Sequence, residues 1–214
     1  MTTVTPPTIT RRERKKAEVR AQILDTAMQL FSRHGLDEVT VDQIADAADI
    51  GKGTVYNYFT TKEDIVVAFM ADLEARVQSK VSRFVVSKEP LDSILAGFVR
   101  LQFRLKSPYH RFVRVFLAQM LIRTEQFLPY MLEMQKAIDP PLKALFLGLQ
   151  ERGLLRKDVD LPELIVTFKT IHLGLSALWA IEGPPFRQTE RTLKIEMKLF
   201  CEGLRKQTRC EHLR

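Results

Sequence analysis

Apolar residues recur with the spacing of amphipathic helices along almost the whole chain after Arg14, and this pattern constrains the fold more than any other feature. No run in the sequence shows the sustained apolar–polar alternation of a half-buried strand. A chain of 214 residues is also long enough to bury a full hydrophobic core. We therefore predict an all-α protein.

Capping signals and prolines divide this pattern into predicted helices. The first helix is expected from about Lys16 to His34, with Gly35 at its end. Thr40–Gln43 and Thr60–Glu63 have capping-box spacing, so each is expected to begin a helix. Prolines favour the first turn of a helix over its interior, and they predict further helix starts near residues 90, 108, 129, 141 and 161.

The segment from Thr40 to Phe59 contains two short helical stretches separated by a break. Two short helices that cross steeply need a small residue at the crossing and apolar residues between them, and Ala45 and Ile44 have these properties. The pattern leaves polar side chains on or beside the outer face of the second stretch, namely Lys52, Thr54, Tyr56, Asn57 and Tyr58. Such a face suits the major groove of DNA, because Asn, Thr and Lys side chains bind base edges or phosphate oxygens.

A second interpretation of this segment is a helical corner that serves only for packing. The outward residues combine tyrosines, Asn, Thr and lysines, where a packing corner usually carries Glu and Lys, so DNA binding is favoured. For Tyr58 alone, a core position beside Phe59 is an equal alternative to a phosphate contact.

The run GTVYNYF, followed by TKE, resembles the tetracycline-repressor (TetR) family of bacterial regulators, and the resemblance covers roughly Lys16 to Leu73. It implies DNA-facing positions at Thr40, Lys52, Gly53, Thr54, Tyr56, Asn57 and Tyr58, and a phosphate contact at Lys62. Asp49 and Gly51 depart from the Gly and the Ser or Thr that many relatives have there. The turn therefore requires Asp in the left-handed conformation, and the recognition helix begins without a hydroxyl cap.

The same resemblance implies a domain organisation. Residues 16–64 are expected to form a three-helix DNA-binding domain with a helix-turn-helix, joined by a long helix to a larger helical domain over residues 65–214 that binds an effector and dimerises. The implied function is a homodimeric repressor that a small-molecule ligand releases from an inverted-repeat operator in double-stranded DNA. The alternative is a helical ligand- or protein-binding module without sequence-specific DNA binding.

Bulky apolar residues and a run of basic residues provide candidates for the effector site. The candidate ligand-binding residues are Phe103, Arg104, Phe112, Phe116, Met120, Phe168 and His172. Plain core packing is the other interpretation of the apolar members and of His172. Between Ser93 and Thr124 the basic residues have no Asp or Glu among them; they are Arg100, Arg104, Lys106, Arg111, Arg114 and Arg123. One or two of these arginines are candidates to meet an apolar, anionic effector, and a solvated helix face is the favoured interpretation of the run.

The last two long helices are expected to pack against their counterparts in a second subunit, as in the family. The final helix is expected from about Thr189 to Lys206. The candidate dimer-interface residues are Phe168, Ile171, Leu175, Leu178, Leu193, Met197, Phe200 and Leu204.

The formal charge of +7 does not by itself locate a DNA-binding half, because residues 21–64 hold three basic and eight acidic side chains. Residues 1–15 are expected to form a flexible basic arm, near the minor groove or simply solubilising. The sequence begins without an apolar secretion signal, and its most apolar stretch, Ile171–Ile181, is shorter than the ~20 residues that cross a bilayer. We expect a cytoplasmic protein without membrane contact.

The sequence carries no local catalytic motif and no cluster of metal ligands. Cys201 and Cys210 lack the spacing of a zinc site, and the four histidines stand apart from one another. We therefore expect no enzymatic activity, no metal and no other cofactor.

Overall fold

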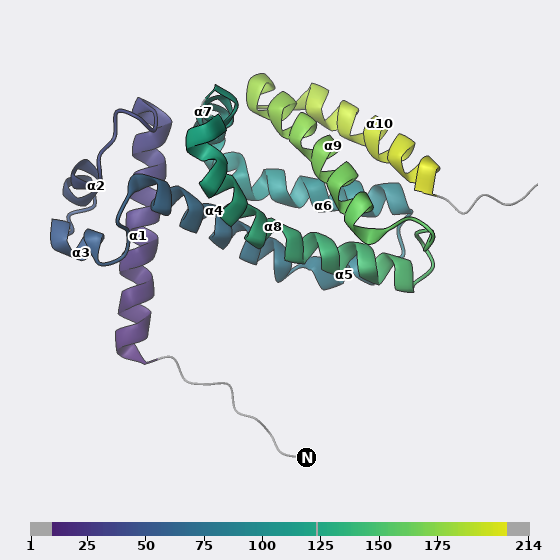
Figure 1. Cartoon of the computed structure of the whole chain (residues 1–214), viewed down its shortest axis with the longest axis horizontal. Helices are drawn as coiled ribbons and strands as arrows, with labels where there is room; N and C mark the ends of the chain where they lie inside the picture. Colours follow the sequence, from purple (N-terminus) through teal and green to yellow (C-terminus); the bar gives the residue numbers. More distant parts are fainter. Residues whose placement is uncertain (1–9, 123, 205–214) are drawn as a thin grey trace, which may run out of the picture. The chain divides into compact units, whose positions relative to one another are not determined.

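The computed structural model describes residues 10–122 and 124–204, and throughout this part of the chain the regular elements are helices, which confirms the predicted fold class. The chain divides into two compact units, Met1–Phe69 and Met70–Arg214. The boundary falls inside helix α4 (Lys62–Gln78), later in the chain than the division expected after residue 64. Figure 1 labels the helices of both units.

Helix α1 (Arg11–His34) supplies much of the core of the first unit, through Ile23, Leu24, Ala27, Met28 and Phe31. It begins earlier than expected, because Thr10 and Glu13 form a capping box in which the N–H of Thr10 donates to the Glu13 carboxylate at 2.8 Å. The expected flexible arm over residues 1–15 is therefore wrong for residues 10–15. Residues 1–9 lie outside the described part of the chain.

Helices α2 (Val41–Ala47) and α3 (Lys52–Tyr56) pack against each other, and α2 also packs on α1. Helix α4 begins one residue later than the predicted capping box. Thr61 and Asp64, and not Thr60 and Glu63, exchange the capping bonds, at 2.8 Å from Thr61 N to Asp64 Oδ2 and 3.1 Å from Asp64 N to Thr61 Oγ1.

The second unit contains α5 (Val81–Val85), α6 (Leu91–Lys106), a 3-10 turn (Ser107–Tyr109), α7 (His110–Ile122), α8 (Thr124–Glu151), α9 (Leu161–Glu182) and α10 (Arg187–Leu204). Helices α6 and α9 pack against α10, and α9 also packs against α7 and α8 (Figure 1). Phe168 lies at the centre of this packing, with ring centroids 5.2 Å from Phe146 and 6.3 Å from Phe98.

The helix starts predicted near residues 129 and 141 are wrong, because α8 continues through Pro129, Pro140 and Pro141. Each interior proline removes one backbone hydrogen bond, at a cost of about 3 kcal/mol or more. Buried apolar residues on both sides of the prolines offset this cost, at roughly 1.5–3 kcal/mol each. These include Met134, Leu142, Leu145, Phe146 and Leu149. Burial of the helix face therefore outweighs the local proline signal.

Helix α9 is long and apolar enough to span a membrane, as judged by length and hydropathy alone. The uninterrupted apolar stretch Ile171–Ile181 is shorter than this helix, which extends back to Leu161. A core helix of a soluble protein has the same properties, and α9 packs against α7, α8 and α10.

Candidate DNA-binding and effector sites

The turn between α2 and α3 has the backbone conformation that the sequence requires. Asp49 has a φ of 53°, in the left-handed region that Asp tolerates. Gly51 begins α3 without a side-chain cap, as expected. Ile44, Ala45 and Val55 are buried between the helices. The predicted helix-turn-helix is therefore present.

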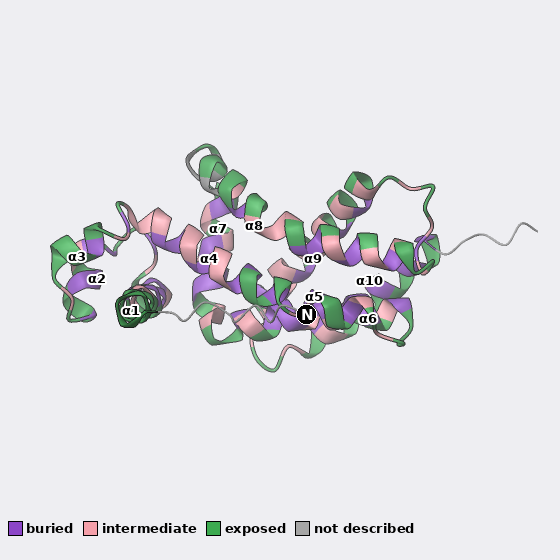
Figure 2. Cartoon of the chain, turned by 90° about the horizontal axis from the view of Figure 1, so that it is seen from below, coloured by how far each residue is buried: buried purple, intermediate pink, exposed green. Residues whose placement is uncertain are grey.

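The outer surface of α3 is open to solvent. Lys52, Gly53, Thr54, Tyr56 and Asn57 are exposed, as the colouring of α3 in Figure 2 shows. Tyr58 is half-buried, and its hydroxyl donates to the backbone carbonyl of Lys16 at 3.3 Å. Tyr58 therefore helps to hold the recognition segment on α1, which agrees with the packing interpretation of this residue.

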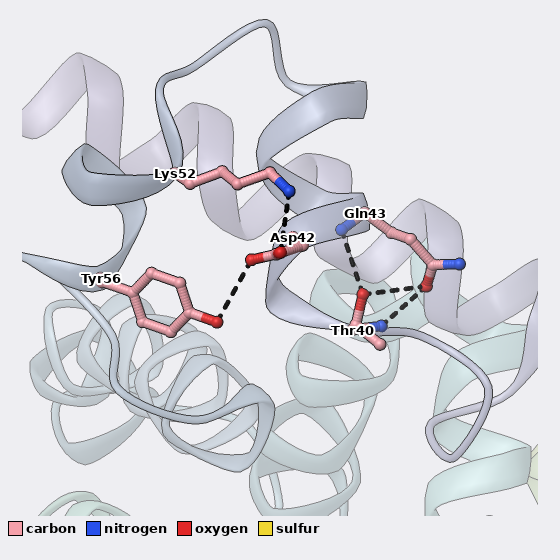
Figure 3. A network of polar contacts seen from close by, with 5 residues as sticks. All are labelled: Thr40, Asp42, Gln43, Lys52 and Tyr56. Carbon is pink, nitrogen blue, oxygen red and sulfur yellow. Dashed lines mark hydrogen bonds and ion pairs between the residues drawn. The ribbon is translucent and has the colours of Figure 1, made fainter.

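Asp42 on α2 connects two of the predicted DNA-facing side chains (Figure 3). The ammonium of Lys52 lies 2.8 Å from Asp42 Oδ2, and the hydroxyl of Tyr56 donates to Asp42 Oδ1 at 3.2 Å. The hydrogen bond from Lys52 lowers the pKa of Asp42, and Asp42 in turn raises the pKa of Lys52. Sequence reasoning missed Asp42; its only signal was an acid in the first turn of α2.

Replacing Asp42 by Asn should tighten binding to any DNA duplex. The change removes a negative charge from this surface and releases Lys52 for a phosphate, so a plot of log affinity against log salt should steepen by about one unit. Fluorescence anisotropy over a salt series measures this slope. Asp46→Asn is the control for the loss of charge alone, because Asp46 is an exposed acid on the same helix that acts on Lys52 through its charge and makes no hydrogen bond to it. Equal salt slopes for Asp42→Asn and Asp46→Asn would show that the hydrogen bond between Asp42 and Lys52 does not affect DNA binding.

Two further predicted DNA-facing residues make structural contacts. The Thr40 hydroxyl accepts from Gln43 N at 3.2 Å and so caps α2 (Figure 3). The Lys62 ammonium donates to the carbonyls of Leu36 and Asp37, at 2.6 and 2.9 Å. Lys62 thus holds the loop before α2, and the third N–H of its ammonium remains for the expected phosphate contact, which stays a prediction.

The second unit contains a mainly apolar pocket of about 480 Å³, lined by residues of α4, α6, α7, α8 and α9. Five of the predicted ligand-binding residues line it, namely Phe103, Phe112, Phe116, Met120 and His172. Two predicted residues do not. Arg104 is exposed and is not among the lining residues, and Phe168 is 1% exposed within the aromatic core.

The arginines predicted to meet an anionic effector do not line the pocket. Arg100 forms a bidentate ion pair with Glu190, with Nε–Oε2 at 2.9 Å and Nη2–Oε1 at 2.6 Å. Arg104, Arg111 and Arg114 are exposed, and Arg123 lies outside the described residues. The basic residue of that run that does line the pocket is Lys106. The described arginines of that run therefore do not line the pocket, and Lys106 is the candidate cation in their place.

Most of the predicted dimer-interface side chains belong to the core of their own subunit. The buried members are Phe168, Leu175, Leu193, Met197 and Leu204, while Ile171, Leu178 and Phe200 are half-buried. A partner cannot reach the buried group, because the apolar stripe on each helix faces α6 and the neighbouring helices. Other apolar side chains on α9 and α10 are exposed, namely Val166, Leu173, Ile181, Ile195 and Leu199.

No metal-binding group of three or more His, Cys, Asp or Glu side chains occurs within residues 10–122 and 124–204. The chemistry of the described sites is thus that of a polar helix surface and an apolar pocket. A helix-turn-helix with an open recognition face, followed by a helical domain with a pocket, defines a DNA-binding regulator.

Comparison with known proteins agrees with this class. Residues 23–69 match the model of "Bacterial regulatory proteins, tetR family". The HTH-type transcriptional repressor KstR2 of Rhodococcus jostii is 28% identical over 178 residues, which cover 78% of this chain and 82% of that protein. The chain belongs to the tetR family of bacterial regulators and is a DNA-binding transcriptional regulator.

Solved structures share the fold. The fatty acid degradation regulator FadR from Bacillus halodurans matches with a TM-score of 0.70 and 21% identity, over 87% of this chain and 96% of that one. FadR from Thermus thermophilus, a repressor crystallised with lauroyl-CoA, matches with a TM-score of 0.67 and 23% identity, over 91% of this chain and all of the other (100%).

Proposed function

We propose that this regulator is a cytoplasmic, homodimeric repressor that an apolar small molecule releases from an inverted-repeat operator. The observation that carries the proposal is that one chain combines the exposed face of α3 with an apolar pocket of about 480 Å³. The volume lies in the range of small-molecule sites, ~300–1,000 Å³. The naming of the relative KstR2 as a repressor supports the direction of control.

The recognition surface of the proposal is the exposed part of α3 and the residue that follows it. Thr54 and Asn57 carry side chains of the kind that bind base edges. Lys52 and Tyr56 suit phosphate oxygens once their hydrogen bonds to Asp42 are broken. Gly53 lets the backbone approach the groove, and Thr40 sits beside this face at the start of α2. Two copies of α3 in a dimer would enter major grooves ~34–36 Å apart, which requires an inverted repeat.

The exposed apolar residues on α9 and α10 support a dimer. Ile181 on α9 is exposed, and Ile195 and Leu199 lie one turn apart on α10, whereas the exposed Val166 and Leu173 line the pocket. Because these two helices pack together within the subunit, their exposed apolar residues form a candidate surface for a second copy.

Release by a ligand requires that the ligand prefer a conformation that does not bind the operator. Helix α4 provides a direct covalent route for this change, because Met70 lines the pocket while Lys62 begins the same helix. The lauroyl-CoA complex of the Thermus thermophilus relative supports an effector with a long apolar chain.

Replacing Asn57 by Ala should relax the choice of operator sequence. An amide that binds a base edge contributes ~1–3 kcal/mol of discrimination against the wrong base, so the variant should lose this preference at one position of each half-site while retaining non-specific binding. Competition between the selected operator and single-base variants measures the loss. Gln78→Ala, at an exposed amide near the end of α4, is the control and should leave the preference unchanged.

The test of the proposal is selection of bound fragments from random duplex DNA, followed by sedimentation of the complex. We expect an inverted repeat and two chains on each fragment. Recovery of no enriched sequence at low salt would contradict the proposed function and would favour the binding module without DNA specificity.

A further inference from the structure

Lys106 of α6 is a buried cation on the wall of the pocket. Its side chain is 10% exposed, and its ion-pair partner among the described residues is Glu74 of α4, whose side chain is 3% exposed. The Lys106 Nζ–Glu74 Oε1 distance is 3.7 Å, longer than the ~2.7–2.9 Å of a charge-assisted hydrogen bond. By contrast, Lys169 of the same pocket lies 2.8 Å from Asp139. The Lys106 ammonium therefore retains hydrogen-bonding capacity that Glu74 does not use.

His172 of α9 supplies a second polar group to the lining of the same pocket. Its Nε2 is buried and makes no hydrogen bond to any residue that the structure describes. The ring stacks on Phe103 at a centroid distance of 5.8 Å, so it is held in place. An unpaired polar atom in an apolar pocket costs free energy, which a bound ligand with a matching oxygen recovers.

Building on the proposed function, we propose that the pocket binds an apolar monocarboxylate whose carboxylate oxygens lie between Lys106 and His172 and displace Glu74 from Lys106. Both nitrogens can donate, and a carboxylate accepts from two donors at once. The remaining wall is apolar, including Phe112, Phe116 and Met120, and suits a hydrocarbon chain.

The competition with Glu74 gives the site a regulatory consequence. Glu74 belongs to α4, the helix that begins at Lys62 and contains the boundary between the two compact units. When a ligand carboxylate takes Lys106, Glu74 loses its buried counterion, which favours a different position of this part of α4. The head group of the ligand, and not only its chain, therefore acts on the helix that leads to the DNA-binding unit.

The experiment measures direct binding to the full chain without DNA, by calorimetry and thermal shift. The probes are octanoate, decanoate and dodecanoate below their micelle concentrations, each with its methyl ester, its alcohol and its coenzyme A thioester. The variants are Glu74→Gln, His172→Phe and the pair Lys106→Met with Glu74→Gln. The paired change removes both charges and so avoids leaving one of them buried alone. Lys136→Met is the control, because that lysine of α8 is an exposed cation paired with Glu133 at 2.6 Å and does not line the pocket.

We expect at least one carboxylate to bind more tightly than its ester and its alcohol. Its affinity should rise in Glu74→Gln, where the competitor for Lys106 is gone, and fall roughly tenfold or more in the paired variant and in His172→Phe. A purely structural role for these residues would not give opposite changes in the two Glu74 variants.

Three results would overturn the inference. The first is that no carboxylate binds more tightly than its own methyl ester. The second is that the coenzyme A thioester binds more tightly than the free acid. The third is that the wild type and the paired variant bind the carboxylate with equal affinity. Because these measurements contain no DNA, each result is separate from the operator selection above. A chain that selects no operator but binds decanoate through Lys106 would contradict the proposed function alone.

Discussion

Truncating Phe168 to Ala should lower the free energy of unfolding of the second unit by ~3–5 kcal/mol. The ring is 1% exposed and contacts Phe98, Phe146 and Phe200, with centroid distances from 5.2 to 6.3 Å. Its removal leaves a cavity that these rigid aromatic neighbours cannot fill. Urea unfolding followed by the fluorescence of Trp179, the one tryptophan of the chain, measures the loss within this unit.

The same measurement shows whether Phe168 belongs to the core of its own subunit or to a dimer interface. A core residue destabilises the unit equally at all protein concentrations, whereas truncating a dimer-interface residue gives a loss that is absent where the chains are monomeric and grows as the concentration rises. Val86→Ala is the control, since Val86 is 71% exposed and should change stability by less than about 0.5 kcal/mol. A loss of under about 1 kcal/mol for Phe168→Ala would refute the assignment to the core.

Acidification should destabilise the wild-type protein more than a His172→Phe variant, by about 2 kcal/mol at about pH 5. Burial lowers the pKa of His172 from its ordinary 6.5 to about 3, with a smaller contribution from the positive charge of Lys106. Between these two values the unfolded chain binds a proton at this site and the folded chain does not. The contribution of neutral His172 to the stability of the folded protein is therefore complete above pH 6.5. It is lost progressively as the pH falls towards 3.

The measurement is urea unfolding of both proteins at about pH 7.5 and about pH 5, compared as the change between the two conditions. Any pH-independent effect of the phenylalanine on the free energy of unfolding cancels in this comparison. The contributions of the titratable groups that both proteins share cancel as well. Parallel pH dependence of the wild type and the variant would show that His172 titrates normally. His110, part of the aromatic cluster with Trp179 and Phe186, stays present in both proteins.

The helix-turn-helix was predictable because its determinants are local. The capping box at Thr40, the left-handed turn at Asp49 and the small Ala45 act within about ten residues of one another, so spacing alone reveals them. Asp42 was missed because its partners come from the next helix. Helix periodicity indicates which face is outward, but it does not show which outward charges meet across a turn.

The effector site shows where local reasoning ends. Phe103, Phe112 and Phe116, predicted to bind a ligand, line the pocket, whereas Phe168 has the same residue type and helical spacing and lies in the core. The arginines of α6 and α7 were expected to meet a ligand, yet Arg100 pairs with Glu190, ninety positions along the chain. Such pairings depend on which helices become neighbours, and residue type and spacing carry no information about this.

The sequence by itself determined the all-helical fold, the recognition face of α3 and the turn that precedes it, because helix periodicity, capping and backbone conformation are short-range properties. Only the tertiary structure decided that α8 continues through its prolines, that Lys62 holds a loop, and that Lys106 and His172 face one pocket. These outcomes depend on burial and on contacts between distant segments, whose free energies exceed local preferences once the helices pack.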